Sequence, residues 1–385
     1  MAQQSKNSGL LQTILNERIN RLRSRRSGLD RSAVIAMDAK DFIVNRSLTK
    51  EAWEHRVKDK PNTTFALGAM QEVDPTYTRI SIETAERVSN QLSKRTSGNL
   101  EFELQGSVPL NVHIRGVSDV DLLAIEADFH TYDARGYMST SGQYRSPTSR
   151  TSVGVLTARR GEISKALRDA FPAATIDTSG SKAIKLQGGS LARPVDVVPS
   201  HWHDTISYQA SGQKHDRAVT ILDSHKNTTI ENWPFLHIKK IRERCETTSG
   251  GLRKSIRLCK NIKADLEAEG KAVTISSFDI ASIMYHANMH SLSVGAYYEL
   301  AILAETQRYL DYLWNNKEEA RRLIVPDGSR FIFNTEDKFN GLMHLSVAMD
   351  SLLREVAKEQ SFLLSLSEKP LLDASRAAVT NALIF

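Results

Sequence analysis

The sequence predicts an α+β protein with two lobes, and three observations lead to this prediction. Its 385 residues suffice for two domains of ordinary size. Hydrophobic residues make up 40% of the chain and charged residues 25%, as in soluble globular proteins. Strand-like and helical segments alternate up to about residue 230, whereas the pattern is helical from Trp233 almost to the end. We expect a mixed-sheet lobe over 1–230 and a helical lobe over 231–385.

The composition excludes several classes of protein. No run of 18 apolar residues occurs, so no transmembrane helix is expected. Cys245 and Cys259 are the only cysteines, too few for a disulfide scaffold or a four-cysteine zinc module. A reducing, cytoplasmic location is the simplest interpretation. The net charge of +6 is compatible with a phosphate-rich partner or substrate.

The first hundred residues are expected to be mostly helical. Residues 10–26 alternate an apolar face with an arginine-rich one, the pattern of an amphipathic helix. The arginine-rich face has two interpretations, an RNA-binding or organelle-targeting arm and an ordinary solvated face, and the pattern favours the second. Further helices are expected at 45–58 and 80–92, the latter starting at Ser81 with acidic residues in its early turns.

A sheet is expected in the second hundred residues. Residues 100–105 alternate apolar and polar side chains, and 118–125 end in a dense apolar run. A polar loop over 130–152 and a helix over 155–170, stopped before Pro172, follow. The remaining expected strands are 175–176, 183–186, 194–198, 205–209 and 218–222.

The segment from Glu103 to Ile125 carries the residues that point to chemistry. Gly106 and Ser107 follow a predicted strand, and a turn of this kind lets backbone N–H groups and a hydroxyl approach a phosphate. Asp119 and Asp121 are separated by one residue, so on a strand they project from the same face. Two such carboxylates cannot both ionise comfortably without a cation, and oxygen ligands select a hard metal such as Mg²⁺.

A third carboxylate stands at Asp196, inside an apolar strand where an isolated charge would be costly. An Asp-x-Asp pair alone is usually a loop or edge feature, and a Gly-Ser pair alone is weaker still. In this order, on strands and with a third Asp, the set favours two-metal phosphoryl transfer. One ion would activate an attacking hydroxyl, and the other would hold a triphosphate and the leaving pyrophosphate.

These residues resemble the signature of the DNA polymerase β-like nucleotidyltransferase superfamily. The stretches 65–92 and 104–123 are further similar to bacterial CD-NTases, the cyclic-oligonucleotide synthases of CBASS anti-phage systems. The resemblance covers roughly residues 60–300. It implies a nucleotidyltransferase lobe with a mixed sheet and a C-terminal helical lobe that closes over the nucleotide.

The resemblance also implies two triphosphate-binding residues in the second lobe. Residues 249–266 match the family's lysine-bearing helix, with Lys260 at the matching place, and Ser277 is the better match, with Ser276 close behind, for a serine that begins a later helix. Arg253, Arg257 and Lys260 follow helical spacing and would share a face. We expect Arg257 to join Lys260 in neutralising phosphate, the alternative being a solvated basic face.

The predicted reaction joins nucleoside triphosphates (ATP, with GTP, UTP and CTP as further substrates) and requires Mg²⁺ or Mn²⁺. A cyclic di- or trinucleotide product and CBASS accessory proteins as partners are implied by the resemblance alone. Two cysteines cannot build the zinc insertion of the DNA-sensing animal enzyme, so stable DNA binding is not predicted. Two alternatives remain: a template-independent transferase acting on an RNA or protein acceptor, and a non-enzymatic binding module.

The segment His201-Trp202-His203 follows Asp196 closely and is a candidate for a second site. Two histidines separated by one residue could bind zinc on a strand, but the only suitable additional ligand nearby is Asp204. Trp202 could stack on a base. We expect Trp202 to be a packing residue and no zinc to be bound.

Overall fold

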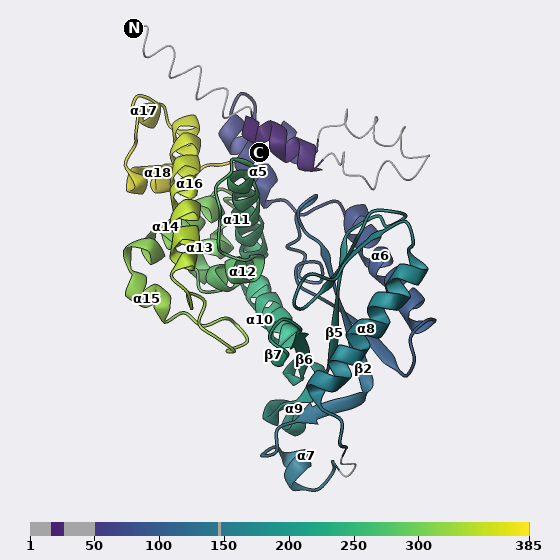
Figure 1. The fold of residues 1–385 in the computed structure, drawn as a ribbon. Coiled ribbons are helices and arrows are strands. Elements are labelled where there is room, and N and C mark those ends of the chain that lie inside the picture. The colour runs from purple at the N-terminus through teal and green to yellow at the C-terminus, as the bar shows by residue number, and fades with distance from the viewer. Residues whose placement is uncertain (1–16, 27–50, 145–147, 385) are drawn as a thin grey trace.

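The structure, a computed structural model, describes residues 17–26, 51–144 and 148–384. A sheet lobe and a helical lobe lie side by side, and helix α10 runs along their junction (Figure 1). The mixed sheet with a C-terminal helical lobe confirms the predicted fold class.

Seven strands form one mixed sheet in the order β1-β2-β5-β4-β3, with β6 paired to β5 and β7 paired to β6. Only β2 and β5 run parallel; the other pairs are antiparallel. The long strand β5 pairs with β4 through its first residues and with β6 through its later ones. The strands are β1 Leu100–Gln105, β2 Val120–Tyr132, β3 Thr175–Asp177, β4 Ile184–Gln187, β5 Val195–Asp204, β6 Ala218–Asp223 and β7 Thr228–Asn232.

Two helices, α6 (Pro75–Ser93) and α8 (Ser152–Ala170), cover one face of the sheet. Each begins at a side-chain cap, because the Asp74 carboxylate accepts from Thr76 N and the Thr151 hydroxyl accepts from Gly154 N. Apolar side chains of both helices pack on the core side of β2 and β5. On the opposite face, Asp121 and Asp196 are followed along their strands by a smaller apolar cluster that includes Leu123, Ile125 and Val198.

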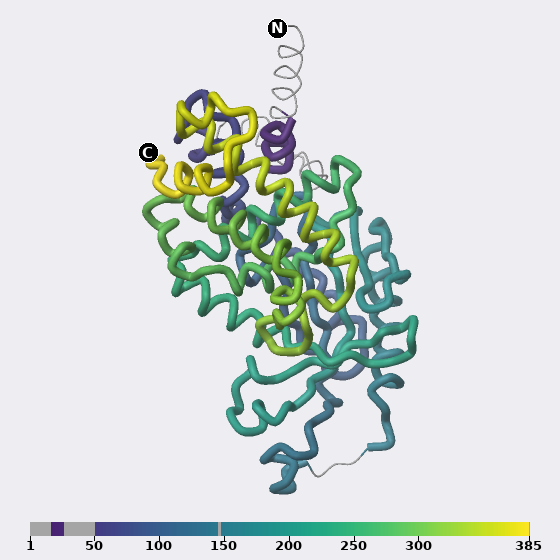
Figure 2. The backbone as a smooth tube through the Cα atoms, turned by 90° about the vertical axis from the view of Figure 1, so that its left-hand side faces the viewer, coloured from purple at the N-terminus to yellow at the C-terminus, as the bar shows by residue number. Residues whose placement is uncertain are grey.

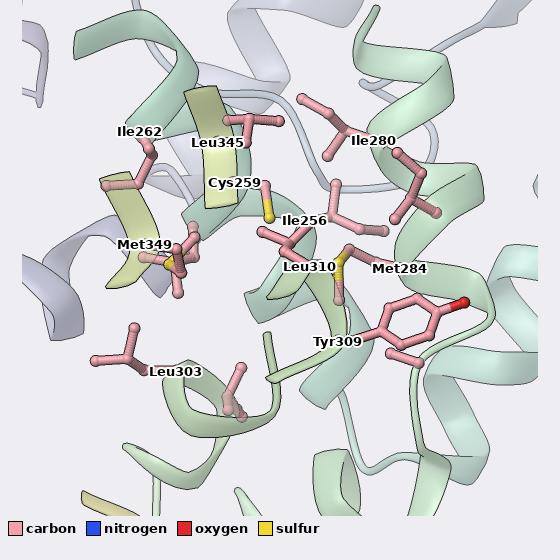
Figure 3. Packing of buried hydrophobic residues seen from close by; sticks show 14 of the residues in the cluster. Ile256, Cys259, Ile262, Ile280, Met284, Leu303, Tyr309, Leu310, Leu345 and Met349 are labelled. Carbon is pink, nitrogen blue, oxygen red and sulfur yellow. The ribbon is translucent and has the colours of Figure 1, made fainter. Parts of the chain in front are cut away.

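The helical lobe is built around α11 (Gly251–Ala268), whose apolar side chains interlock with those of α12, α14 and α16 (Figure 3). Among the described residues, every helix is too short or too polar to span a bilayer. The other elements of this half are α10 Pro234–Thr247, α12 Ser277–Tyr285, α13 Met289–Val294, α14 Ala301–Asn315, α15 Lys317–Arg321, α16 Asp337–Gln360, α17 Phe362–Ser365 and α18 Leu372–Thr380.

The N-terminal helices belong to the helical lobe rather than to the sheet lobe. Helix α5 (Pro61–Met70) packs on α11 and α16, and Phe65 and Leu67 share their hydrophobic core. Figure 2 shows the purple helix of residues 17–26 at the same end of the molecule. The early helices of the predicted first lobe, 1–230, therefore pack in the second lobe, because the apolar side chains of these helices fit against α11.

The arginine-rich face of residues 17–26 is paired with acids rather than solvated. Arg25 Nη1 donates to Asp265 Oδ1 at 2.7 Å, and Arg21 Nη2 donates to Glu269 Oε1 at 2.8 Å. Arg23 and Arg26 contact acidic residues at the start of the short helix α4 (Ala52–His55). These ion pairs join the N-terminal helix to the helical lobe. Residues 10–16 lie outside the described residues.

Several local predictions were wrong. Residues 205–209 are not a strand but begin α9 (Ile206–Ser211), capped by the Thr205 hydroxyl and ended by Gly212 at φ +64°. Strand β7 was missed, and α6 starts at Pro75 rather than Ser81. The predicted loop over 130–152 includes the end of β2 and the short helix α7 (Tyr137–Thr140), while the short 3₁₀ helix Lys214–Asp216 follows α9. Of the expected helix 45–58, the structure describes residues 51–58 only. Within these residues, only Ala52–His55 are helical and form α4.

Candidate active site

Three aspartates lie on neighbouring strands at the centre of the sheet. The parallel register of β2 and β5 places Asp121 directly opposite Asp196. Asp119 comes immediately before β2, two residues from Asp121. The flanking Val120 and Leu122 are buried in the core on the other face. Strand alternation thus directs the acids away from the apolar core, as the sequence predicted.

Gly106 allows the turn after β1 to lie against the Asp121 carboxylate. Gln105 pairs with Asp121 across the strands, and Gly106 follows at φ +73°. A Cβ added at Gly106 would lie 2.2 Å from Asp121 Oδ2, a distance that no side chain tolerates. Ser107 is next in this turn, and its carbonyl accepts from Val112 N at 3.1 Å. Glycine is required here for both its backbone conformation and its lack of a side chain.

Burial and mutual repulsion disfavour the ionised form of these carboxylates when no cation is bound. Burial, together with the neighbouring Asp196 and Asp119 carboxylates, raises the pKa of Asp121 to about 7. Burial and the Asp119 charge also raise the pKa of Asp196. Asp196 Oδ1 is buried and has no hydrogen-bond partner among the described residues. An all-oxygen set with an orphaned carboxylate oxygen fits a hard divalent cation.

The Asp119 carboxylate forms an ion pair with Lys185 on β4. This hydrogen bond raises the pKa of the lysine. Within the described part of the chain, no three acidic, histidine or cysteine side chains already converge as metal ligands do. Binding of a cation by all three aspartates would therefore require these side chains to move closer together.

Lys260 projects from α11 and is fixed by the loop that follows Ser107. Its ammonium donates to Val112 O at 2.9 Å and to Ser118 Oγ at 3.1 Å. Burial lowers the pKa of Lys260 to about 8, although the charge of Asp121 acts in the opposite direction. The lysine is therefore a buried cation near the carboxylates, brought from the other lobe.

A cavity of about 880 Å³ between the lobes brings these groups together. This volume is within the usual range for a small-molecule site. Seven of the eight site residues predicted from the sequence line it: Gly106, Ser107, Asp119, Asp121, Asp196, Lys260 and Ser277.

Ser276 and Ser277 have different roles. The Ser276 hydroxyl caps α12 by accepting from Asp279 N at 3.0 Å, whereas Ser277 is exposed and lines the cavity. Ser277 is thus the serine available to a ligand.

Arg257 does not line the cavity, contrary to the prediction. Its guanidinium is buried and donates to Met70 O at 2.8 Å and to Asn111 O at 2.7 Å. Although Arg257 is three residues before Lys260 on α11, its side chain is occupied by backbone carbonyls of α5 and of the loop before β2. It ties α11 to these segments, which keeps Lys260 in place.

Comparison with known proteins agrees with this arrangement. Residues 239–349 match the family model described as the cGAS/DncV-like nucleotidyltransferase C-terminal helical domain. The chain is 48% identical over 309 residues to the cyclic dinucleotide synthase CdnE of Yersinia aleksiciae, covering 80% of each protein. The chain belongs to the CD-NTase family. It is accordingly a nucleotidyltransferase of the cyclic-oligonucleotide synthase family.

Two further comparisons extend this CD-NTase assignment. The chain is 31% identical to a c-di-GMP synthase of Capnocytophaga granulosa, over 72% of this chain and 82% of that protein. The solved structure of a STING-associated CdnE c-di-GMP synthase from the same species superposes with a TM-score of 0.66 at 25% identity. That match covers 90% of this chain and 99% of the other.

Sequence reasoning missed part of the cavity wall of this CD-NTase. Phe278 stacks on His237 with ring centroids 4.3 Å apart, and the Arg330 guanidinium lies 5.3 Å from the Phe278 ring. Lys182, from the connection between β3 and β4, also lines the cavity. These residues lie far apart in sequence and match no spacing rule.

Trp202 is a packing residue, as expected. It is 4% exposed, and its indole Nε1 donates to Glu101 Oε2 at 2.9 Å. His201 and His203 do not belong to any metal-ligating cluster among the described residues.

Proposed function

We propose that this CD-NTase is a divalent-metal-dependent synthase that joins nucleoside triphosphates into a cyclic di- or trinucleotide. The observation that carries the proposal is the meeting of Asp119, Asp121 and Asp196 with Gly106 and Lys260 at one cavity. A ribose hydroxyl attacks the α-phosphorus of a donor triphosphate. A new P–O bond forms, the bond between the α-phosphorus and the bridging oxygen breaks, and pyrophosphate leaves with that electron pair.

The three aspartates would hold Mg²⁺ or Mn²⁺, which would supply charge neutralisation of the phosphates and a more acidic hydroxyl. Asp196 also lies where it can accept the hydroxyl proton, because its orphaned Oδ1 is available. The Gly106 backbone and the Ser107 hydroxyl bind the donor triphosphate from the sheet lobe. Lys260 and Ser277 bind it from the helical lobe, so closure of the lobes assembles the donor site.

Cyclisation is supported by the relatives, which are named as cyclic dinucleotide and c-di-GMP synthases. The cavity between compact lobes suits a short linear intermediate that turns over and reacts again. Such a product would act as a second messenger in anti-phage defence, with CBASS accessory proteins as partners. ATP, GTP, CTP and UTP are the candidate substrates.

The test is to incubate the protein with the four labelled triphosphates and Mg²⁺, without primer, and to analyse the products by mass spectrometry. A product of cyclic mass that resists phosphatase is expected. The matched control is Asp196→Asn, which should give none. A ladder of phosphatase-sensitive oligomers, or a strict requirement for an RNA or protein acceptor, would contradict the cyclase and favour the alternative transferase.

A further inference from the structure

The carboxylates of the active site have a cationic or phosphate-binding group on each side along the sheet. The proposed function uses the group on the β1 side and leaves Lys185, on the β4 side, without a role. Along the sheet, the Gly106 turn follows β1, Asp121 lies on β2, Asp196 on β5 and Lys185 on β4. The Gly106 turn and Lys185 therefore flank the aspartates on opposite sides. A second nucleotide that offers its hydroxyl near Asp196 would lie towards β4.

Lys185 shares the active-site face with Asp196. The two residues are directly paired across β4 and β5, and paired residues point to the same face. Its neighbours Ile184 and Leu186 are fully buried in the core on the other face. The Lys185 side chain is 38% exposed while it contacts Asp119. A cation bound to Asp119 would compete with this contact and leave the ammonium available to another anion.

Lys182 stands at the rim of the same cavity without a partner of its own. It is exposed, lines the cavity, and its ammonium forms no hydrogen bond or ion pair with any residue that the structure describes. It lies two residues before β4, the strand that carries Lys185.

The loop that carries Lys182 is unusually well anchored for a surface connection. The largely buried Arg160 of α8 donates to four of its carbonyls, with distances between 2.6 and 3.2 Å. These carbonyls belong to Thr178, Gly180, Lys182 and Ala183. Ser224 on the far side donates through its backbone N to Ser181 O at 2.8 Å. A fixed backbone reduces the entropy lost when the lysine binds a ligand.

We propose that Lys182 and Lys185 bind the 5′-phosphates of the acceptor nucleotide, with Arg160 as the residue that positions Lys182. The inference rests on the proposed function, in which two highly anionic triphosphates enter one cavity. The donor phosphates have Lys260 and the metal ions, so the acceptor phosphates require cations of their own. The two lysines on the β4 side supply them.

The experiment isolates one transfer. A 2′,3′-dideoxynucleoside triphosphate labelled at its α-phosphate can donate but has no hydroxyl with which to accept. Each of the four bases is offered as acceptor in two forms, the nucleoside triphosphate and the nucleoside. Transfer rates then report how strongly the enzyme uses the 5′-phosphates of the acceptor.

Lys182→Ala and Lys185→Gln should each lower kcat/KM for the triphosphate acceptor by about tenfold or more, the usual effect of losing a charge-assisted contact. For Lys182→Ala, the rate with the nucleoside acceptor and the KM for the donor should change little. Lys185→Gln also loses the contact with Asp119, so its expected effect is a fall in the ratio of the triphosphate rate to the nucleoside rate. Arg160→Gln should cause the same selective loss, which a general folding defect would not. Lys165→Ala, an exposed lysine on α8, is the matched control and should behave as wild type.

Equal losses with the triphosphate and nucleoside acceptors, or a wild-type enzyme with no preference between them, would overturn this inference and leave the proposed function intact. Failure of the wild-type enzyme to transfer to any acceptor would overturn both.

Discussion

Replacing Asp121 by asparagine should abolish catalysis and, without divalent metal, stabilise the protein. Burial and two neighbouring carboxylates raise the pKa of Asp121 from 3.8 to about 7. A tenfold change in proton affinity corresponds to about 1.4 kcal/mol, so the ionised carboxylate lowers the free energy of unfolding by at most about 4 kcal/mol. This penalty is absent below about pH 4, grows as pH rises towards 7, and is complete above it, because the unfolded chain ionises first.

The assay is thermal and urea unfolding of wild type and Asp121→Asn in EDTA, at pH 5 and at pH 8. The variant should unfold at a Tm several degrees higher at pH 8, with a smaller difference at pH 5. Added Mg²⁺ should stabilise wild type more than the variant, since the carboxylate then has its cation. Asp169→Asn, at an exposed position near the end of α8, is the matched control.

A variant that is no more stable than wild type at pH 8 in EDTA would refute the view of Asp121 as a strained, cation-requiring carboxylate. Retention of more than a few per cent of wild-type activity would refute its role as a metal ligand.

Four further predictions rest on the same geometry. Lys260→Ala should raise the KM for the donor triphosphate about tenfold or more, measured by steady-state kinetics, because a contact worth roughly 1.5–3 kcal/mol is lost; an unchanged KM would exclude the contact. Gly106→Ala should leave less than a tenth of the wild-type kcat/KM, since its Cβ would collide with Asp121 Oδ2; full activity would show that the turn is free to move. Arg257→Ala should lower the free energy of unfolding by about 2 kcal/mol or more in urea titrations, since a buried and a partly buried carbonyl lose their donor. Removal of divalent metal by EDTA should stop product formation, and Mg²⁺ or Mn²⁺ should restore it; activity that persists in EDTA would contradict the metal assignment.

Local sequence patterns are enough to predict the strands around the three candidate active-site aspartates. Alternation in 100–105 and the apolar run around Asp121 are local patterns, and both became strands. The spacing of Asp119 and Asp121 on a strand, with a glycine turn before it, predicted a shared face because side-chain direction depends only on adjacent residues. Asp196 was identified for a similar reason, as a charge inside an apolar strand.

Contacts between distant segments establish which of these side chains meet. The register of β2 against β5 places Asp196 opposite Asp121, although 75 residues of chain separate them. Lys260 and Arg257 lie on the same helix, yet Lys260 lines the cavity, whereas Arg257 is held by backbone carbonyls of α5 and of the loop before β2. The position of Lys182 depends on a loop whose carbonyls accept hydrogen bonds from Arg160 of α8.

Contacts between distant segments also explain the packing of the N-terminal helices on α11 and the helical form of residues 206–211. Local patterns follow from the conformational preferences of neighbouring residues, so they can be predicted from the sequence. Contacts between distant segments determine the partners of a buried cation, the register of paired strands and the surface on which a helix packs. The burial and hydrogen bonding of these contacts outweigh local preference.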